Sequence, residues 1–395
     1  MNFTLTEEQS LLGDAIDRFN ADRSRRRGVD ASEGRGRPEA TGESMRALWA
    51  GLAELGLAGL LVPETYGGSQ AGVGGSMADV MVMMQAAGRA LMVEPLVATA
   101  VIGATLLEAD TDLTRRAQYL DRLVGGDLLV ALAHAEPDAS ASMFRVTTRA
   151  QAQGDVYVLD GRKSVVLDGG DADLLLVSAR VSGSADEAHG VSLFVIDASA
   201  PGVVRRDYAT LDGHRACELM LDAVRLPASA MLGAPGEARA LIEHALDRGS
   251  AALCAEAVGV METLLAHTTE YLRTRQQFGQ VIGRFQVLQH KAVDLLVHLE
   301  QSRSMAYLAC LRADAPDRDE AARAVSAARV SMARSARAFA QTAIQLHGGI
   351  GMTDELPASH HARRLSLIEF WLGTREQHLD RYMALAARDE ATSSA

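Results

Sequence analysis

The sequence predicts an α+β protein of several domains, with a helical region, then a β region, then a second helical region. Apolar residues recur at helical spacing up to about residue 125, alternate at strand spacing to about residue 235, and then return to helical spacing. The strand-like segments have no helices between them, which favours an antiparallel sandwich or barrel over a parallel sheet. With 395 residues, 48% of them hydrophobic, the chain can bury several cores. We therefore expect domains at residues 1–125, 126–235 and 236–395.

The middle region contains the clearest turn signal. In the segment VYVLDGRKSVVL, residues 156–167, apolar residues alternate on both sides of Asp160 and Gly161. An Asp-Gly pair readily adopts the positive φ angles of a tight turn, so this segment predicts a β-hairpin. Lys163 follows the turn and is expected at the surface or packed against a neighbouring domain. Further strands are predicted at residues 172–181, 190–199 and 217–227.

The last region is predicted to be a helical bundle. One helix carries an apolar stripe formed by Leu288, Ala292, Leu295, Leu296 and Leu299. Residues 321–346 are rich in alanine, which permits close packing of helices.

Composition and charge disfavour several classes of protein. Lys and Arg total 39 against 51 Asp and Glu, so the formal charge of −12 leaves no basic excess to neutralise nucleic-acid phosphates. The three cysteines lack CxxC spacing, which disfavours disulfides and is typical of the reducing cytoplasm. The sequence starts without a signal-peptide pattern, and the longest uncharged apolar run, residues 95–107, is too short for a bilayer. We expect a cytoplasmic protein that binds neither nucleic acid nor membrane. We also expect no metal site, because His347, His360 and His361 lack a typical ligand spacing.

The most informative stretch is residues 271–294, YLRTRQQFGQVIGRFQVLQHKAVD. Its pattern predicts the end of one helix, a glycine-containing turn and the start of another helix. Arg275 is compatible with an ordinary surface position in such a loop. The local density of Arg, Gln, Phe and Gly is equally compatible with contact to an anion and stacking on a flat ring.

This stretch resembles the RxxFG…IxxFQ signature of acyl-CoA dehydrogenases. The match is Arg275 to Gly279 followed by Ile282 to Gln286, and residues 345–351, QLHGGIG, resemble the family's QxxGGxG motif. The similarity covers essentially the whole chain. It implies an N-terminal α domain, a middle antiparallel β-barrel or sandwich, and a C-terminal four-helix bundle, with FAD bound where two subunits meet.

The resemblance also implies which residues hold the cofactor. Arg275 and Gln286 are expected to contact the FAD of a neighbouring subunit, and residues 345–349 its diphosphate and adenosine end. A guanidinium pairs well with a diphosphate, and glycines let backbone N–H groups come close to it. The glycines alone would equally fit a turn that ends a helix. The positions implied for FAD are Arg275, Phe278, Gln286, Gln345, Leu346, His347, Gly348, Gly349, Thr374 and Glu376.

The catalytic base of the family has no counterpart at the matching positions. In the family reaction a carboxylate takes the α-proton of an acyl-CoA while the β-hydride moves to the flavin. The two positions at which the resemblance would place that carboxylate hold Leu372 and Gly249. Glu369 is a candidate for a displaced base, although its position equally fits a solvated or salt-bridged helix carboxylate. The substrate contacts implied by the resemblance are Asp247 and Gly373.

Other segments depart from the family in the same direction. The family's flavin-contacting Trp-Ile-Thr is matched by residues 164–166, Ser-Val-Val, and an arginine that usually follows the substrate segment is Ser250. Glu256 is expected to pack between helices and not to act as a catalyst. The groups that would reach a neighbour's FAD are kept, whereas those that would serve a site within this chain are not.

We therefore expect the subunit of a heteromeric, FAD-dependent acyl-CoA dehydrogenase that lacks the base. It resembles the small subunits of enzymes such as pimeloyl-CoA dehydrogenase, some relatives of which act on steroid side chains. The implied partners are a large dehydrogenase subunit, an acyl-CoA and an electron-transfer flavoprotein. Two alternatives stay open: a homomeric dehydrogenase in which Glu369 is the base, and a structural subunit without flavin.

Overall fold

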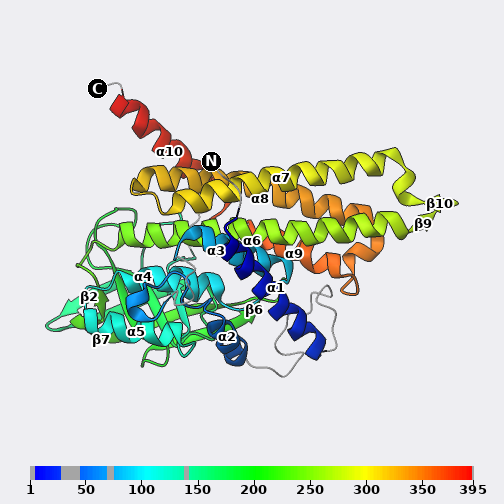
Figure 1. The fold of residues 1–395 in the computed structure, drawn as a ribbon. Coiled ribbons are helices and arrows are strands. Elements are labelled where there is room, and N and C mark those ends of the chain that lie inside the picture. The colour runs from blue at the N-terminus through cyan, green and yellow to red at the C-terminus, as the bar shows by residue number, and fades with distance from the viewer. Residues whose placement is uncertain (1–4, 28–44, 69–74, 138–141, 394–395) are drawn as a thin grey trace. The chain divides into compact units, whose positions relative to one another are not determined.

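The computed structural model describes residues 5–27, 45–68, 75–137 and 142–393 (Figure 1). The order of helices, strands and helices is the one predicted. The residues group into two compact units that alternate along the chain. Unit 1 comprises Met1–Gly42, Met77–Met92 and Ser250–Ala395, and unit 2 comprises Glu43–Ser76 and Val93–Gly249. The domain boundaries at residues 125 and 235 stay a prediction, because unit 1 combines segments from both helical regions.

Unit 2 is built on a mixed sheet in the order β6-β7-β3-β2-β4-β5-β8, with β1 paired to β4. Its pairs are antiparallel except for β1 with β4 and a single pair between β2 and β4. The strands are β1 (Val130–Ala133), β2 (Arg149–Gln153), β3 (Val156–Leu167), β4 (Leu174–Arg180), β5 (Val191–Asp197), β6 (Val203–Ala209), β7 (Arg215–Pro227) and β8 (Met231–Leu232). The helices are α2 (Met45–Glu54), η3 (Glu64–Tyr66), η4 (Leu96–Gly103), α4 (Ala104–Glu108), α5 (Leu113–Val124) and η6 (Ala228–Ala230). The sheet encloses a core that includes the fully buried Leu159, Leu175, Phe194 and Ile196.

The hairpin predicted at Asp160 and Gly161 is wrong. Residues 156–167 form one continuous strand, and the β2–β3 turn falls earlier, at Gly154 and Asp155. Gly161 lies at an irregularity where β3 shifts its register against β7. A Cβ on Gly161 would come within 2.5 Å of Thr148 Oγ1. The glycine therefore permits a close approach of the backbone and does not form a turn.

Unit 1 is a bundle of long helices. In Figure 1, α7 and α8 lie side by side, and the short β9–β10 hairpin projects beyond the end of α6 and the start of α7. The elements are α1 (Glu7–Arg27), α3 (Met77–Arg89), α6 (Arg239–Thr274, which starts in unit 2), β9 (Gln276–Gln277), β10 (Gln280–Val281), η7 (Ile282–Arg284), α7 (Gln286–Ala313), α8 (Arg318–His347), η8 (Gly348–Met352), α9 (Pro357–Ile368) and α10 (Arg375–Ser393). Gly88 in α3 and Gly259 in α6 let these helices touch, because a Cβ on either would overlap backbone atoms of the other helix.

Within the described residues, α6 is the one helix long and apolar enough to cross a membrane. Of its apolar 18-residue stretch, 78% is buried inside the protein. Core helices of globular proteins meet the same criterion.

Candidate functional site

The first signature lies at one end of unit 1. The β9–β10 hairpin turns on Phe278 and Gly279, whose φ angles are 55° and 78°. Two-residue hairpins of this kind need positive φ at both turn residues, which Asn or Gly adopts more easily than Phe. Phe278 is 89% exposed, and its ring lies edge-on to that of Phe285 with 6.1 Å between the centroids. A strained, exposed aromatic residue indicates a surface that contacts another molecule.

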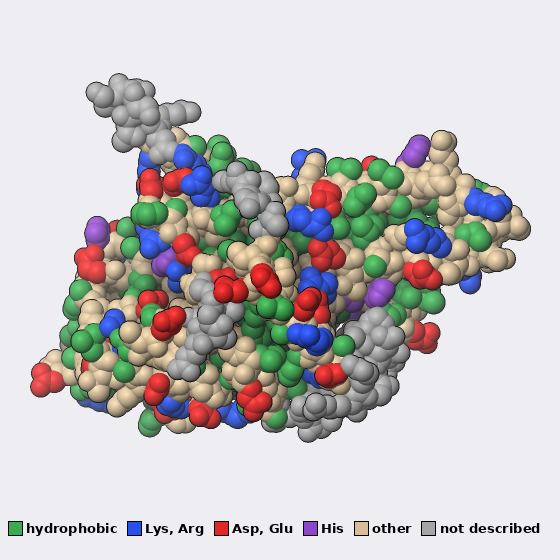
Figure 2. Space-filling view, in the orientation of Figure 1, with side chains coloured by type: hydrophobic (Ala, Val, Ile, Leu, Met, Phe, Trp, Pro, Cys, Tyr) green, Lys and Arg blue, Asp and Glu red, His purple; other side chains and the backbone are tan. Residues whose placement is uncertain are grey.

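Cationic side chains surround this hairpin. Arg273, Arg275 and Arg284 are exposed, and none has an ion pair with a described Asp or Glu. Arginines elsewhere in unit 1, such as Arg303, do pair with carboxylates. Residues 271–293 contain no acidic residue, although the whole chain carries a formal charge of −12. Figure 2 shows Lys and Arg side chains at this end of the bundle, which is therefore suited to an anion.

The second signature meets the first at this end. α8 ends at His347, and Gly348 follows with φ of 69°. A Cβ on Gly348 or Gly349 would meet nothing within 4 Å, so the turn offers open backbone to a ligand. Gln345 is exposed, whereas Leu346 and His347 are buried. The His347 ring lies 4.7 Å from the ring of Tyr271, which is in the last turns of α6. This contact brings the two signatures together, and their contact with FAD stays a prediction.

The predicted position of the missing base lies in a tightly held loop between α9 and α10. Leu372 has φ of 56° and Gly373 has φ of 108°. The buried Arg329 Nη2 donates to the carbonyl oxygens of Ile368 at 3.0 Å and Trp371 at 2.5 Å. His378 Nε2 lies 3.1 Å from Leu372 O. The loop geometry is fixed by its backbone contacts, yet it presents a leucine.

The two glutamates on either side of Leu372 in the sequence, Glu369 and Glu376, both form ion pairs with arginines. Both carboxylate oxygens of Glu369 accept from Arg337, at 3.0 and 2.8 Å. Glu376 is exposed and pairs with Arg375 at 2.9 Å. Thr374 begins α10 by exchanging hydrogen bonds with Gln377: Thr374 N donates to Gln377 Oε1, and Gln377 N donates to Thr374 Oγ1. These contacts account for the positions of Glu369, Glu376 and Thr374 without any bound ligand. The roles predicted for them in catalysis and FAD binding stay predictions.

The second position of the missing base lies in the interior of α6. Gly249 and Asp247 are buried there, and no carboxylate stands at Gly249 itself. Further along the helix, Glu256 forms a buried ion pair with Arg364, with distances of 2.6 and 2.7 Å. It therefore packs between helices, as expected. Arg364 also covers the ring of Trp371 at 4.0 Å from its centroid.

Lys163 is not at the surface, because its side chain is fully buried in unit 2. Its Nζ donates to Glu136 Oε1 at 2.6 Å and to Ser178 Oγ at 3.1 Å, and Ser178 Oγ lies 2.8 Å from His134 Nδ1. Burial lowers the pKa of Lys163 to about 8, against the opposing effect of Glu136. Ser, His, Lys and Glu also occur together in hydrolase active sites. Ser178 is fully buried, however, so a substrate could not reach its hydroxyl. The network stabilises the sheet next to residues 164–166.

Comparison with known proteins identifies the fold and the family. Models of the acyl-CoA dehydrogenase N-terminal, middle and C-terminal domains match residues 6–127, 131–224 and 239–385. The acyl-CoA dehydrogenase FadE12 of Mycobacterium tuberculosis is 30% identical over 315 residues, which cover 79% of this chain and 80% of that protein. This chain belongs to the acyl-CoA dehydrogenase family.

Two solved structures share its fold. The FAD complex of PigA is 26% identical with a TM-score of 0.85, and covers 98% of this chain and 99% of its own. A variant of the steroid acyl-CoA dehydrogenase Tcur3481-Tcur3483 is 29% identical with a TM-score of 0.82, and covers 98% of this chain and 100% of its own. Members of the family are flavin-dependent oxidoreductases, and FAD is their cofactor.

The end of unit 1 fits part of that cofactor. Arg275 has no ion pair with a carboxylate of the described residues, and the turn at Gly348 and Gly349 leaves backbone open, which together suit a diphosphate. Among the described residues, no cluster of three or more His, Cys, Asp or Glu is placed to hold a metal ion. Sequence reasoning missed the anchoring roles of Arg329 and Arg364. For Arg329 the available signal was a charged residue within the alanine-rich helix α8.

Proposed function

We propose that this acyl-CoA dehydrogenase chain is the subunit of a heteromeric enzyme that completes the FAD site of a partner and lacks the catalytic base. The observation that carries the proposal is an asymmetry within unit 1. The hairpin around Arg275 and the turn at Gly348 and Gly349 are exposed, and Arg275 pairs with no Asp or Glu in the part of the chain that the structure describes. The loop that would carry the base has Leu372 in a fixed backbone conformation.

In the proposed enzyme each side chain has a defined task. Arg275 and the backbone N–H groups of the glycine turn would hold the diphosphate of the partner-bound FAD. Phe278 packs against the flat part of the cofactor or against the partner. When bound, FAD would supply the hydride acceptor for desaturation of the acyl-CoA thioester. The partner supplies the carboxylate that takes the α-proton, the product is a trans-2-enoyl-CoA, and an electron-transfer flavoprotein accepts the electrons.

The comparisons support a heteromer indirectly. The steroid enzyme that this chain resembles is named as a pair, Tcur3481-Tcur3483. A large partner subunit and a heteromer like pimeloyl-CoA dehydrogenase are consistent with that similarity. The acyl group is left open by these observations.

The two alternatives have less support. A homomeric enzyme with Glu369 as the base requires a free carboxylate, but both oxygens of Glu369 accept from Arg337. A structural subunit without flavin leaves two features without explanation: the strained, exposed Phe278, and Arg275, which pairs with no acidic residue among those described.

Replacing Arg275 in the complex with its partner is expected to weaken FAD binding. Arg275→Ala removes a charge-assisted hydrogen-bonding group, which is worth about 1.5–3 kcal/mol, so the Kd for FAD rises about tenfold or more. The Kd is measured by fluorescence titration of the deflavinated complex.

The matched control is Arg334→Ala, which removes another exposed arginine, on α8, that has no ion pair with an acidic residue in the described ranges. It is expected to leave FAD binding unchanged. Equal FAD affinity in the wild-type and Arg275→Ala complexes would contradict the proposed role. A loss of turnover in Glu369→Gln with FAD retained would favour the homomeric alternative.

A further inference from the structure

His347 ends α8 directly before the glycine turn, and its imidazole ring is buried. Nδ1 lies 2.9 Å from the carbonyl oxygen of Ala343, so this nitrogen carries a hydrogen and donates it. In the neutral ring Nε2 then has a lone pair and no hydrogen. Nε2 is buried and has no hydrogen-bond partner among the described residues. Burial of a polar atom without a hydrogen bond is unfavourable, and such an atom in a folded protein often has a functional role.

The groups around the ring favour its protonated form. The ring of Tyr271, on α6, lies 4.7 Å from that of His347, and the face of an aromatic ring attracts a cation. The backbone of His267, one turn earlier on α6, also favours the protonated ring, as does the backbone of Ala343. The C-terminal end of a helix attracts positive charge, and His347 is the last residue of α8.

Burial opposes these effects and lowers the pKa of His347, so the ring is neutral at pH 7 in the chain without a ligand. The titratable side chain in contact with the ring is Tyr271, and His361 of α9 lies behind His267, with 5.4 Å between those two rings. η8 packs on His347 through Gly351 and contains no titratable residue. None of the Asp, Glu, Lys and Arg residues that the structure describes on α6, α7, α8 or α9 shifts this pKa. A charge that arrived beside the ring would therefore meet no competing charge.

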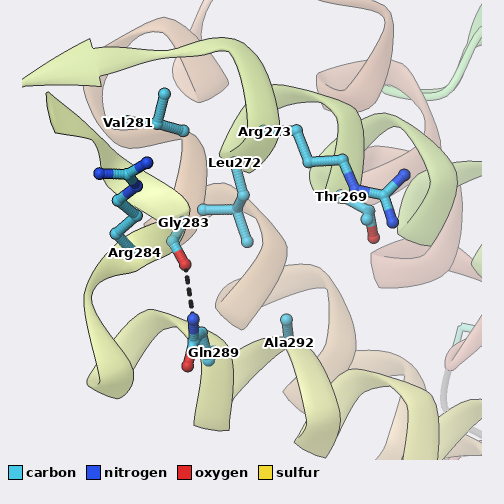
Figure 3. A pocket seen from close by; sticks show the side chains of 8 residues that line it. All are labelled: Thr269, Leu272, Arg273, Val281, Gly283, Arg284, Gln289 and Ala292. Carbon is cyan, nitrogen blue, oxygen red and sulfur yellow. Dashed lines mark hydrogen bonds between the residues drawn. The ribbon is translucent and has the colours of Figure 1, made fainter.

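The last turn of α6 is held rigidly beside this ring. A Cβ on Gly283 would lie 2.7 Å from Leu272 O, so only glycine lets η7 pack this closely on α6. An open pocket of about 410 Å³ lies at this junction, and Arg273 and Arg284 are among the residues that line it (Figure 3). His347 does not line the pocket. The buried ring acts through the turn that follows it and not by contact with a ligand in that pocket.

We propose that His347 takes up a proton when the diphosphate of FAD binds at the turn of Gly348 and Gly349. The inference rests on the proposed function, because it requires an anion at this turn. The negative charge of the diphosphate favours the imidazolium, and the imidazolium attracts the diphosphate. Because the two binding events are linked, each raises the affinity for the other by the same factor. His347 is thus a positioning residue whose charge makes the affinity for FAD depend on pH.

The pH dependence has a definite sign. The pKa of His347 in the chain without FAD lies below 6.5, and that in the FAD-loaded complex is higher. Between the two values FAD binding takes up part of a proton, so FAD binds more weakly as the pH rises. A rise in the pKa of about one unit on binding makes the Kd for FAD about threefold lower, or more, at pH 6 than at pH 7.5.

The test is calorimetric titration of FAD into the deflavinated complex of this chain with its partner, between pH 6 and pH 7.5. PIPES and Bis-Tris buffers have different enthalpies of ionisation, so titrations in both report the number of protons taken up. We expect the wild type to take up a fraction of a proton at pH 6 to 6.5 and almost none at pH 7.5. His347→Gln cannot carry the charge and is expected to bind FAD without proton uptake, with a Kd that does not change with pH.

The control is His290→Gln, at an exposed histidine on α7, which is expected to keep the wild-type proton uptake. FAD binding to the wild type without proton uptake would overturn the proposal, as would undiminished uptake in His347→Gln. If His347→Gln does not fold, the wild-type titrations in the two buffers decide alone. A complex that binds no FAD, or binds it without help from Arg275, contradicts the proposed function instead. Binding that depends on Arg275 but takes up no proton contradicts only the role of His347.

Discussion

Arg364→Ala is expected to lower the free energy of unfolding by about 3–5 kcal/mol, because it leaves the buried carboxylate of Glu256 without its partner. The two side chains are at most 3% exposed and are joined by two hydrogen bonds of 2.6 and 2.7 Å. The change also removes the cation that covers the Trp371 ring at 4.0 Å, and Trp371 belongs to the loop of the missing base. Urea unfolding of the full chain, followed by tryptophan fluorescence and circular dichroism, measures the effect.

Two comparisons make this result specific. Arg312→Ala breaks a half-exposed ion pair with Glu320 and is expected to cost less than about 1 kcal/mol. The double variant Glu256→Leu, Arg364→Met replaces both charges by apolar groups and is expected to recover most of the stability. A loss in Arg364→Ala no larger than that in Arg312→Ala would show that the buried pair does not hold α6 and α9 together.

Acidification from pH 7 to pH 5 is expected to destabilise the chain by about 2 kcal/mol for each of three buried histidines. Burial lowers the pKa of His134 to about 3, that of His361 to about 4 and that of His378 to about 3. Nearby Lys163 and Arg239 add to the shift at His134, and Arg329 and Arg381 to that at His378. These imidazoles are therefore neutral in the folded chain at pH 5.

The direction follows from proton binding. Between pH 6.5 and the folded-state pKa values, the unfolded chain binds more protons than the folded one, so stability falls as pH falls and the loss is complete near pH 3 to 4. The free energy of unfolding is measured by urea titration at several pH values. His361→Gln is expected to reduce the slope with pH, whereas His290→Gln, at an exposed histidine, is not. A stability that is independent of pH between 7 and 5 would show that these three imidazoles are not held neutral in the folded chain.

Several features of the fold followed from the sequence because they depend on local patterns. The helical and strand periods predicted the order of the three regions, and the two signatures predicted which residues gather at the end of unit 1. The Asp160-Gly161 prediction failed because a glycine that permits positive φ serves equally well where a backbone approaches closely. Thr148, which requires that glycine, comes from outside the strand. Only the folded chain shows this neighbour.

Buried charges were the other feature that local patterns did not reveal. Lys163, Arg329 and Arg364 are fully buried, and their partners lie 27, 42 and 108 residues away. A charged residue inside an apolar pattern signals burial, but the partner that neutralises it depends on tertiary contacts. The same limit applies to the pocket lined by Arg273 and Arg284, because the close approach of Gly283 to Leu272 that forms it is visible only in three dimensions.

The proposal that this chain completes the FAD site of another subunit is tested by comparing the chain alone with the chain and its partner. FAD content and turnover are measured for both. The chain is purified by itself and after co-expression with an acyl-CoA dehydrogenase from the same genomic neighbourhood, and FAD is measured by absorbance. We expect a colourless, inactive chain alone and a yellow complex that oxidises an acyl-CoA. A chain that by itself carries one FAD and turns over an acyl-CoA at the rate of the complex would contradict it.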